Sequence, residues 1–378
     1  MIDLRDEEKM LLETVRRFAK DKLAPRAPGC EQQERFDAES WDELSGLGLA
    51  AVTVSEENGG MPVGFPVLAR LVEELSSGSA PLSAAYLVHC TVAHLLDNFG
   101  TDQQKQKYLP GLLSGQMMGA LAISEPGAGS DVGALATTAH MTGGDYLVKG
   151  QKVFITSGGL AGLYVVLTKT GQGNGSPELT ALLVEPGWPG FSVGRREKKM
   201  GQKASPTTEL YFEELKVPGS ALIGQPGQGL SLIMDGLNRS RVLVAATAVG
   251  LARAAYEAAL DYTRERKQFG RPLVAFQGLR WMLADMAILI ETSRRITEHA
   301  AQLVQAGRPF IKEAAMAKAF ATDAAMKVTT DAVQLLGGYG YMEDYPVERY
   351  MREAKLLQIV EGTNQIQREV IAKEIARS

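Results

Sequence analysis

The spacing of apolar residues changes twice along this chain, near residue 119 and again near residue 230. Before the first change, apolar residues recur as they do on one face of an amphipathic helix. Between the changes, short runs of β-branched and aromatic residues are broken by glycine pairs, which predicts strands joined by tight turns. After the second change, alanine-rich runs predict long helices that pack closely. The expected fold is mainly α with a β middle domain.

The first region, residues 1–118, is predicted to be an N-terminal helical domain. An apolar face over residues 10–18 predicts a first helix, and Pro25 and Pro28 are expected to end it. Ser40 is expected to cap a helix that starts at Trp41, with a glutamate three residues later completing a capping box.

The middle region, residues 119–228, is predicted to be a β-barrel or sandwich domain. A Gly143-Gly144-Asp145 turn predicts one hairpin, and the module is expected to end near Pro226. The expected strands cover residues 136–141, 146–148, 153–156, 164–169, 179–184 and 209–212. The last region, residues 229–378, is predicted to be a helical bundle. Its expected helices cover residues 241–265, 276–306 and 311–335, with a last helix from Thr363.

Charge and cysteine content exclude several classes of protein. The 378 residues carry a net charge of −4 without a large basic cluster, so nucleic acid is not an expected partner. Cys30 and Cys90 lie far apart, which disfavours a disulfide framework and fits a reducing compartment. No HExxH pattern is present, and no metal site is predicted.

The acidic start resembles neither a secretory signal nor a transit peptide, and no apolar run of about 18 residues indicates a membrane span. We therefore expect a cytoplasmic protein without a membrane partner. A processed organellar protein would have the same pattern.

Glu361 is the strongest candidate for chemistry, because it follows the apolar run Leu356–Val360 and precedes Gly362. Apolar surroundings disfavour a charged carboxylate and raise its pKa, and glycine lets the backbone approach a ligand closely. The alternative is an ordinary turn into the last helix, with Thr363 as its N-cap and Glu361 in solvent.

Two segments in the β module could hold a planar ligand. The loop from Ser124 to Asp131 offers backbone N–H groups and two hydroxyls to a polar edge, although it could be a plain turn. The strand from Lys152 to Thr156 is expected to place Phe154 and Thr156 on one face, because side chains alternate. Phe154 could equally belong to the core.

Two further segments end predicted helices. Basic residues followed by glycine occur at 265–272, and a run of glycines occurs at 334–340. Both patterns are common at helix C-termini. Their alternative role is to contact a phosphate or a ribose through Arg266, Gln268 and the glycines.

Taken together, five segments resemble the acyl-CoA dehydrogenase family of flavoenzymes over essentially the whole chain. The segments are SEPGAGSD at 124–131, a K-x-x-I-T strand at 152–156, ERKQFGRP at 265–272, QLLGGYG at 334–340 and EGTNQIQ at 361–367. The resemblance implies an N-terminal helical domain, a middle β domain and a C-terminal four-helix bundle. It also implies a homotetramer, built as a dimer of dimers, that binds FAD between the middle and C-terminal domains with help from a neighbouring subunit.

The resemblance also implies roles for individual residues. Those expected to line the flavin ring are Leu121, Ile123, Ser124, Phe154 and Thr156. Ser130 is expected near the flavin phosphates or the thioester side of the substrate. The residues expected to contact the pyrophosphate and adenosine of the FAD bound to a neighbouring subunit are Arg266, Gln268, Phe269, Gln277, Gln334 and Gly338. Thr363 and Gln365 are expected to contact the dinucleotide.

Glu361 matches the catalytic base of the family, which removes the α-proton of an acyl thioester while the β-hydrogen leaves as hydride to the flavin. The thioester carbonyl would be stabilised by the backbone N–H of Glu361 and a ribityl hydroxyl. Some members carry the base where this chain has Ser240. Ser130, Asn238, Arg241 and Gly362 are expected near the substrate. Asn238 replaces an acidic residue that many relatives carry.

The implied function is FAD-dependent dehydrogenation of a short, medium or branched saturated acyl-CoA to the trans-2-enoyl-CoA, with electron-transfer flavoprotein as acceptor. The Asn238 replacement keeps open an acyl or aminoacyl group on a carrier protein in a biosynthetic pathway. An oxidase, a desulfinase and a non-catalytic thioester-binding protein are further alternatives. Glu361 argues against the desulfinase, and the chain length argues against the larger oxidases.

Overall fold

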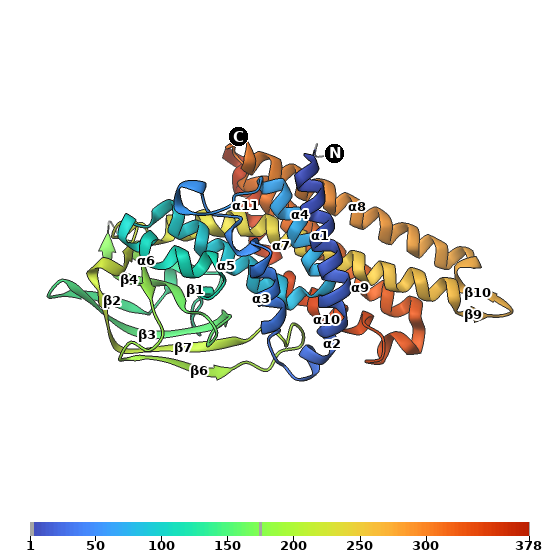
Figure 1. Cartoon of the computed structure of the whole chain (residues 1–378), viewed down its shortest axis with the longest axis horizontal. Coiled ribbons are helices and arrows are strands. Elements are labelled where there is room, and N and C mark those ends of the chain that lie inside the picture. The colour runs from blue at the N-terminus through green and yellow to red at the C-terminus, as the bar shows by residue number, and fades with distance from the viewer. Residues whose placement is uncertain (1–3, 174–175, 378) are drawn as a thin grey trace.

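A computed structural model describes residues 4–173 and 176–377. The three regions follow one another as the apolar spacing predicted. The strands gather at one end of an elongated molecule, and the long C-terminal helices extend to the other end (Figure 1). The N-terminal helices lie across the middle, against both.

The N-terminal region is helical. Its helices are α1 (Asp6–Phe18), α2 (Ala24–Gln32), α3 (Ala38–Gly46), α4 (Phe65–Gly78), α5 (Ala80–Phe99) and α6 (Asp102–Leu113). The prediction that Pro25 and Pro28 end the first helix was wrong. A π-helical turn, Ala19–Leu23, joins α1 directly to α2. Pro25 then falls in the first turn of α2, where its missing N–H is tolerated, and Pro28 lies inside α2.

The predicted cap of α3 was also wrong. Asp37 is the N-cap, and its carboxylate accepts hydrogen bonds from the Ser40 N–H at 3.1 Å and the Ser40 hydroxyl at 2.6 Å. A carboxylate at the N-cap also complements the positive end of the helix dipole, so Asp37 outcompetes the serine for this position.

The middle region forms an eight-stranded sheet. Its strands are β1 (Gly119–Ala122), β2 (Thr138–Thr142), β3 (Asp145–Thr156), β4 (Leu163–Gly173), β5 (Ser176–Val184), β6 (Phe191–Arg196), β7 (Thr207–Pro218) and β8 (Leu222–Ile223). Their order is β6-β7-β3-β2-β4-β5-β8, with β1 parallel to β4. The two strands expected at 146–148 and 153–156 are one strand, β3, whose pairing with β7 shifts register between Lys152 and Ile155.

The C-terminal region is built on one long helix. Its helices are α7 (Gly229–Glu265), α8 (Gln277–Gln305), α9 (Ile311–Leu336), α10 (Val347–Leu357) and α11 (Asn364–Arg377). A short hairpin of β9 (Lys267–Gln268) and β10 (Arg271–Pro272) connects α7 to α8. Helix α7 starts at Gly229, next to the change of spacing expected near residue 230 and twelve residues before the alanine-rich run at 241–265. It packs against α4, α5, α8, α9 and α10.

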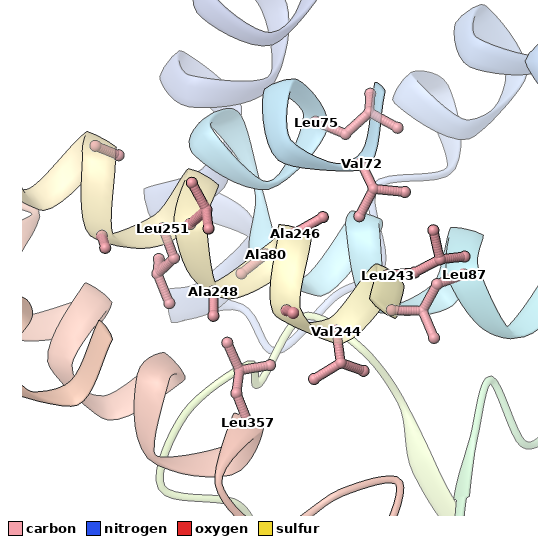
Figure 2. Close-up of a cluster of buried hydrophobic side chains, with 14 of the residues drawn as sticks. Val72, Leu75, Ala80, Leu87, Leu243, Val244, Ala246, Ala248, Leu251 and Leu357 are labelled. Carbon is pink, nitrogen blue, oxygen red and sulfur yellow. The ribbon is translucent and has the colours of Figure 1, made fainter. Parts of the chain in front are cut away.

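Small residues let α7 pack closely in the core. Figure 2 shows Ala246 and Ala248 of α7 among leucine and valine side chains from α4, α5 and α10. At Gly250 of α7, a Cβ would lie 2.1 Å from the backbone oxygen of Glu73 on α4. The two backbones therefore meet at a spacing that only glycine permits.

Helix α7 is also, among residues 4–173 and 176–377, the helix whose length and composition would suffice to cross a membrane. No membrane-spanning run was predicted from the sequence, because the apolar character of α7 comes from alanine, glycine and valine rather than from an unbroken stretch of large side chains. In the fold, 78% of its most apolar window is buried inside the protein. Core helices commonly show this combination.

The contact at Gly250 gives a stability test. Alanine normally stabilises a helix interior relative to glycine by up to about 1 kcal/mol. We expect Gly250→Ala instead to lower the free energy of unfolding by about 1–3 kcal/mol, because two packed helices must move apart. The matched control is Gly278→Ala in α8, where a Cβ would meet nothing within 4 Å. Denaturant unfolding followed by circular dichroism checks this, and equal effects of the two variants would contradict the close contact.

Candidate active site

Glu361 lies in a tight turn between α10 and α11. Its φ of +56° and the φ of +89° at Gly362 place both residues in the left-handed region. A non-glycine residue there is uncommon, and such residues cluster at active sites and ligand contacts. A Cβ at position 362 would lie 2.9 Å from the Nε2 atom of Gln367, so the turn requires its glycine.

The Glu361 carboxyl is partly cut off from water and from hydrogen bonds. Its Oε2 atom is buried without a hydrogen-bond partner. This desolvation raises the pKa of Glu361 to about 7, although Arg241, Lys318 and the Ser240 side chain oppose the rise. A carboxyl group with a pKa near neutrality can both take up and release a proton at physiological pH. The alternative of a solvated Glu361 does not fit this burial.

Hydrogen bonds from several helices hold the turn. Arg241 of α7 donates from Nε to the Glu361 carbonyl oxygen at 3.1 Å. Gln367 of α11 donates to the carbonyl oxygens of Glu361 and Gly362 at 3.1 and 2.9 Å. Thr363 is the N-cap of α11 as predicted, because its Oγ1 accepts from the Ile366 N–H at 3.3 Å.

A cavity of about 220 Å³ reaches Ser240, whose hydroxyl acts on Glu361. It lies between α4, α5, α7 and the end of α8. Its lining residues are Val52, Thr53, Pro62, Val63, Phe65, Leu68, Cys90, Thr91, His94, Gly236, Arg239, Ser240, Leu243, Val304 and Gln305. The Ser240 hydroxyl is buried without a hydrogen-bond partner. The cavity therefore has a mixed apolar and polar lining, and it borders Ser240, the residue that acts on the Glu361 carboxyl.

Asn238 and Arg241, which the sequence places near the substrate, contact each other. The Oδ1 atom of Asn238 accepts a hydrogen bond from Nη1 of Arg241 at 2.6 Å, and both side chains are buried. Burial lowers the pKa of Arg241. Asn238 thus orients an arginine that bonds the Glu361 carbonyl.

In the β module, a buried ion pair fixes the segment that carries Ser124. The Lys152 ammonium donates to Glu125 Oε1 at 2.8 Å and to the Ile123 carbonyl at 2.9 Å. Burial lowers the pKa of Lys152 to about 8. The Glu125 carboxylate also accepts from the backbone N–H groups of Ala136 and Thr137.

The same segment is bonded to the bulged part of β3. The Val153 N–H donates to the Ser124 carbonyl at 2.9 Å, so Ser124 and Phe154 lie on adjoining backbone segments. Phe154 has a φ of +60° and is 67% exposed, and Thr156 is half-buried. Phe154 is therefore not a core residue. Leu121, Ile123 and Ser124 are half-buried as well, while Ser130 is exposed.

Exposed Phe154 beside the Ser124 hydroxyl fits one face and one polar edge of a planar ring system such as the isoalloxazine of FAD. Glu125 and Lys152, which hold this arrangement, lie within the sequence motifs, but no role was predicted for them. The strand and the loop carry other polar residues as well, so nothing in the sequence set these two apart.

The residues expected to serve a neighbour's cofactor lie elsewhere. Figure 1 shows the β9–β10 hairpin at the end of the molecule opposite the sheet. The residues expected to serve the neighbouring cofactor are all exposed: Arg266, Gln268, Phe269, Gln277, Gln334 and Gly338. Phe269, at the hairpin tip, is 93% exposed with a φ of +53°. The structure brings these residues together at the end of the molecule away from the sheet.

Thr363 and Gln365 line a further cavity of about 270 Å³ beside the Glu361 turn. Its remaining lining residues are Asp323, Lys355, Gln358, Ile359, Asn364 and Arg368. Across the described residues, 4–173 and 176–377, no group of three or more histidine, cysteine, aspartate or glutamate side chains could hold a metal ion.

Three family models match consecutive parts of the chain. They are the acyl-CoA dehydrogenase N-terminal domain over residues 5–116, the middle domain over 120–215 and the C-terminal domain over 227–376. A short-chain-specific acyl-CoA dehydrogenase from Clostridium acetobutylicum is 43% identical over 378 residues, which cover 99% of each chain.

Solved structures of proteins with related names are also similar to the chain. Butyryl-CoA dehydrogenase from Megasphaera elsdenii superimposes with a TM-score of 0.96 at 39% identity, over 100% of both chains. A chain from a structure described as the electron transferring flavoprotein of Acidaminococcus fermentans superimposes with a TM-score of 0.97 at 41% identity, again over 100% of both chains.

The ion pair beneath Ser124 gives a second stability test. We expect Glu125→Ala to lower the free energy of unfolding by about 3–5 kcal/mol, because it leaves the Lys152 charge buried and unpaired. The control is Asp6→Ala, which removes an exposed ion pair with Lys9 and should change stability by about 0–1 kcal/mol. Urea unfolding of both variants measures the difference, and similar small losses would rule out the proposed anchor.

Proposed function

The chain belongs to the acyl-CoA dehydrogenase family, and we propose that it converts a short, medium or branched saturated acyl-CoA to the trans-2-enoyl-CoA with Glu361 as the α-proton base. The observation that carries this role is the buried Oε2 atom of Glu361, which lacks a hydrogen-bond partner. Ser240, which acts on this carboxyl, lines the 220 Å³ cavity. A carboxyl oxygen free of other bonds is available to accept a proton from the substrate.

The site residues divide the work of this reaction. The cavity holds the acyl chain away from water, and the turn holds the Glu361 carboxylate at its side. The proton taken from the α-carbon moves to a Glu361 oxygen. We assign the backbone N–H of Glu361 to the thioester carbonyl, where negative charge develops. FAD, the cofactor of the family, supplies the hydride acceptor when bound.

The residues of the β module form the proposed flavin site. Phe154 would cover one face of the ring, and Ser124 and Thr156 would donate to its polar edge. Leu121 and Ile123 would complete the wall, and Ser130 would face the phosphates or the pantetheine side. Thr363 and Gln365, which line the 270 Å³ cavity beside the base, would contact the dinucleotide.

One contact counts against a carrier protein as the thiol partner. That alternative rested on Asn238 lying near the head of CoA, but its side chain is buried against Arg241. Acyl-CoA is also the substrate class in the names of similar proteins. We therefore propose the CoA thioester, and a chain length that the 220 Å³ cavity accepts.

We also propose a homotetramer and electron-transfer flavoprotein as the electron acceptor. The exposed residues around the β9–β10 hairpin lie at the end of the protomer opposite the sheet, so they would bind the cofactor of another subunit (Figure 1). The similarity to a chain from an electron transferring flavoprotein structure supports the acceptor. The domain boundaries at 118/119 and 228/229 are part of the same proposal.

Glu361→Gln tests the base. It keeps the shape and the bound cofactor but removes the proton acceptor, so we expect acyl-CoA binding with a rate lower by about 10²–10⁴-fold or more. In the unaltered enzyme, kcat/KM should fall about tenfold per pH unit below a pH of about 7, because protonated Glu361 cannot accept a proton. Anaerobic flavin bleaching across a panel of acyl-CoAs, with one acyl group also offered on a carrier protein, measures both. Near-normal bleaching by Glu361→Gln would remove Glu361 from the mechanism.

Phe269→Ser tests the contribution of the hairpin. Stacking of a base on an aromatic ring is worth about 1–3 kcal/mol. We therefore expect FAD affinity to fall roughly tenfold while the stability of the protomer is unchanged, since the Phe269 side chain is almost fully exposed. The control is Met10→Ser, at an exposed position on α1. Equilibrium FAD titration of the apoprotein reports the affinity, and unchanged binding would place the adenosine elsewhere.

A further inference from the structure

Lys318 of α9 is a fully buried lysine beside the proposed base. Its side chain has 0% exposure, and its ammonium donates to the Gly362 carbonyl at 2.9 Å and to Asn364 Oδ1 at 2.8 Å. Among the described residues it forms no salt bridge within 4 Å. A buried ammonium bonded only to neutral oxygens is costly, so it needs a compensating role.

Lys152, the other fully buried lysine described above, shows the contrast. Its ammonium lies 2.8 Å from the Glu125 carboxylate, which neutralises it directly. Lys318 has instead a longer-range attraction to Glu361 and to Asp323. No carboxylate in direct contact neutralises the positive charge of Lys318, and this charge acts on the Glu361 carboxyl.

Two cations bind consecutive carbonyl groups at the strained turn. Arg241 donates to the Glu361 carbonyl and Lys318 donates to the Gly362 carbonyl. A left-handed non-glycine residue is unfavourable and persists only where its surroundings fix it. The two donors arrive from α7 and α9, so they tie the turn to the two helices that pack most extensively in the bundle.

The charged and polar groups that face Glu361 come from three helices. Helix α7 contributes Ser240 and Arg241, and α9 contributes Lys318. Asp323 of α9 acts on Lys318, but it is already bonded to Arg368, Gln358 and Asn364. Helix α11 contributes the neutral amides of Asn364 and Gln367. The field at the base is therefore dominated by two cations.

We propose that Lys318 is a positioning residue for Glu361: it fixes the turn that aims the carboxylate at the substrate, and its charge favours the ionised form of that carboxylate. This inference rests on the proposed function of Glu361. Lys318 does not line the acyl cavity. Its loss should therefore lower kcat and leave KM nearly unchanged.

The direction of the pH effect follows from charge. Burial lowers the pKa of Lys318 to about 7, the range in which Glu361 titrates, so the two groups titrate as a coupled pair. A positive Lys318 lowers the pKa of Glu361. Removing that charge raises it, so Glu361 is protonated over a wider pH range and the acid limb of kcat/KM moves to higher pH.

The test compares Lys318→Met, Lys318→Gln and Lys318→Arg in the FAD-loaded enzyme. Lys327→Met is the control, because Lys327 is on the same helix but exposed and paired with Asp331. Infrared difference spectra against Glu361→Gln follow protonation of the Glu361 carboxyl without turnover. In Lys318→Met and Lys318→Gln we expect the apparent pKa of Glu361 to rise by about one unit or more, since a nearby opposite charge shifts the pKa of a carboxyl by about 1–3 units. Lys318→Arg should retain most of the original value.

The kinetic readout is the pH profile of kcat/KM with one acyl-CoA. We expect its acid limb to shift with the infrared titration in Lys318→Met and Lys318→Gln, and not in Lys327→Met. If Lys318→Met and Lys318→Gln lose activity equally at every pH with an unchanged infrared titration, Lys318 is merely structural and the inference is overturned. If Lys318→Met does not fold, Lys318→Gln, which keeps an amide donor, decides between the two results.

The infrared titration also separates this inference from the proposed function. Near-normal turnover in Glu361→Gln would overturn the role of the base, whereas an unshifted Glu361 titration in the Lys318 variants would overturn only the positioning role.

Discussion

The burial of α7 is the constraint on which the rest of the structure depends. This helix packs against α4, α5 and α8–α10, and its N-terminal part also contacts β4 and β5 of the sheet. Its position is set by small residues, as the approach of Gly250 to the Glu73 backbone shows. Because Asn238, Ser240 and Arg241 lie on this helix, its packing also places side chains that surround Glu361, the proposed base.

Much of the fold follows from the apolar spacing. The change of period predicted the helical, β and helical regions, because each period reflects which face of an element is buried. The errors were local. Pro25 did not end a helix because a π turn shifted the preceding hydrogen bonds, and Ser40 lost its cap position to Asp37. Both outcomes depend on which nearby group competes best for a backbone donor, and the period carries no information on that.

The candidate site was predicted in part. The sequence marked Glu361 through its apolar run and glycine, and it marked Phe154 and Phe269 through their motifs. It gave no role to Lys318, which lies 43 residues before Glu361, or to Asn364, which lies three residues after Glu361. Lys318 sits in an alanine-rich helix whose buried face can be assigned only once its neighbours are known. Such a residue becomes visible through three-dimensional burial and through the carbonyl groups that it contacts.

Backbone strain links the separate parts of the site. Non-glycine residues with positive φ among the described residues are Glu34, Phe154, Ser157, Gln202, Glu214, Phe269 and Glu361. Three of them, Phe154, Phe269 and Glu361, are residues that the motifs had already singled out. A left-handed residue turns its side chain away from the direction that regular alternation would give. At Phe154 this leaves the ring exposed at a bulge, at Phe269 it projects the ring from the hairpin tip, and at Glu361 it exposes the carboxyl to the buried cations. At these three positions, the chain thus departs from regular geometry where we propose that a side chain meets a ligand.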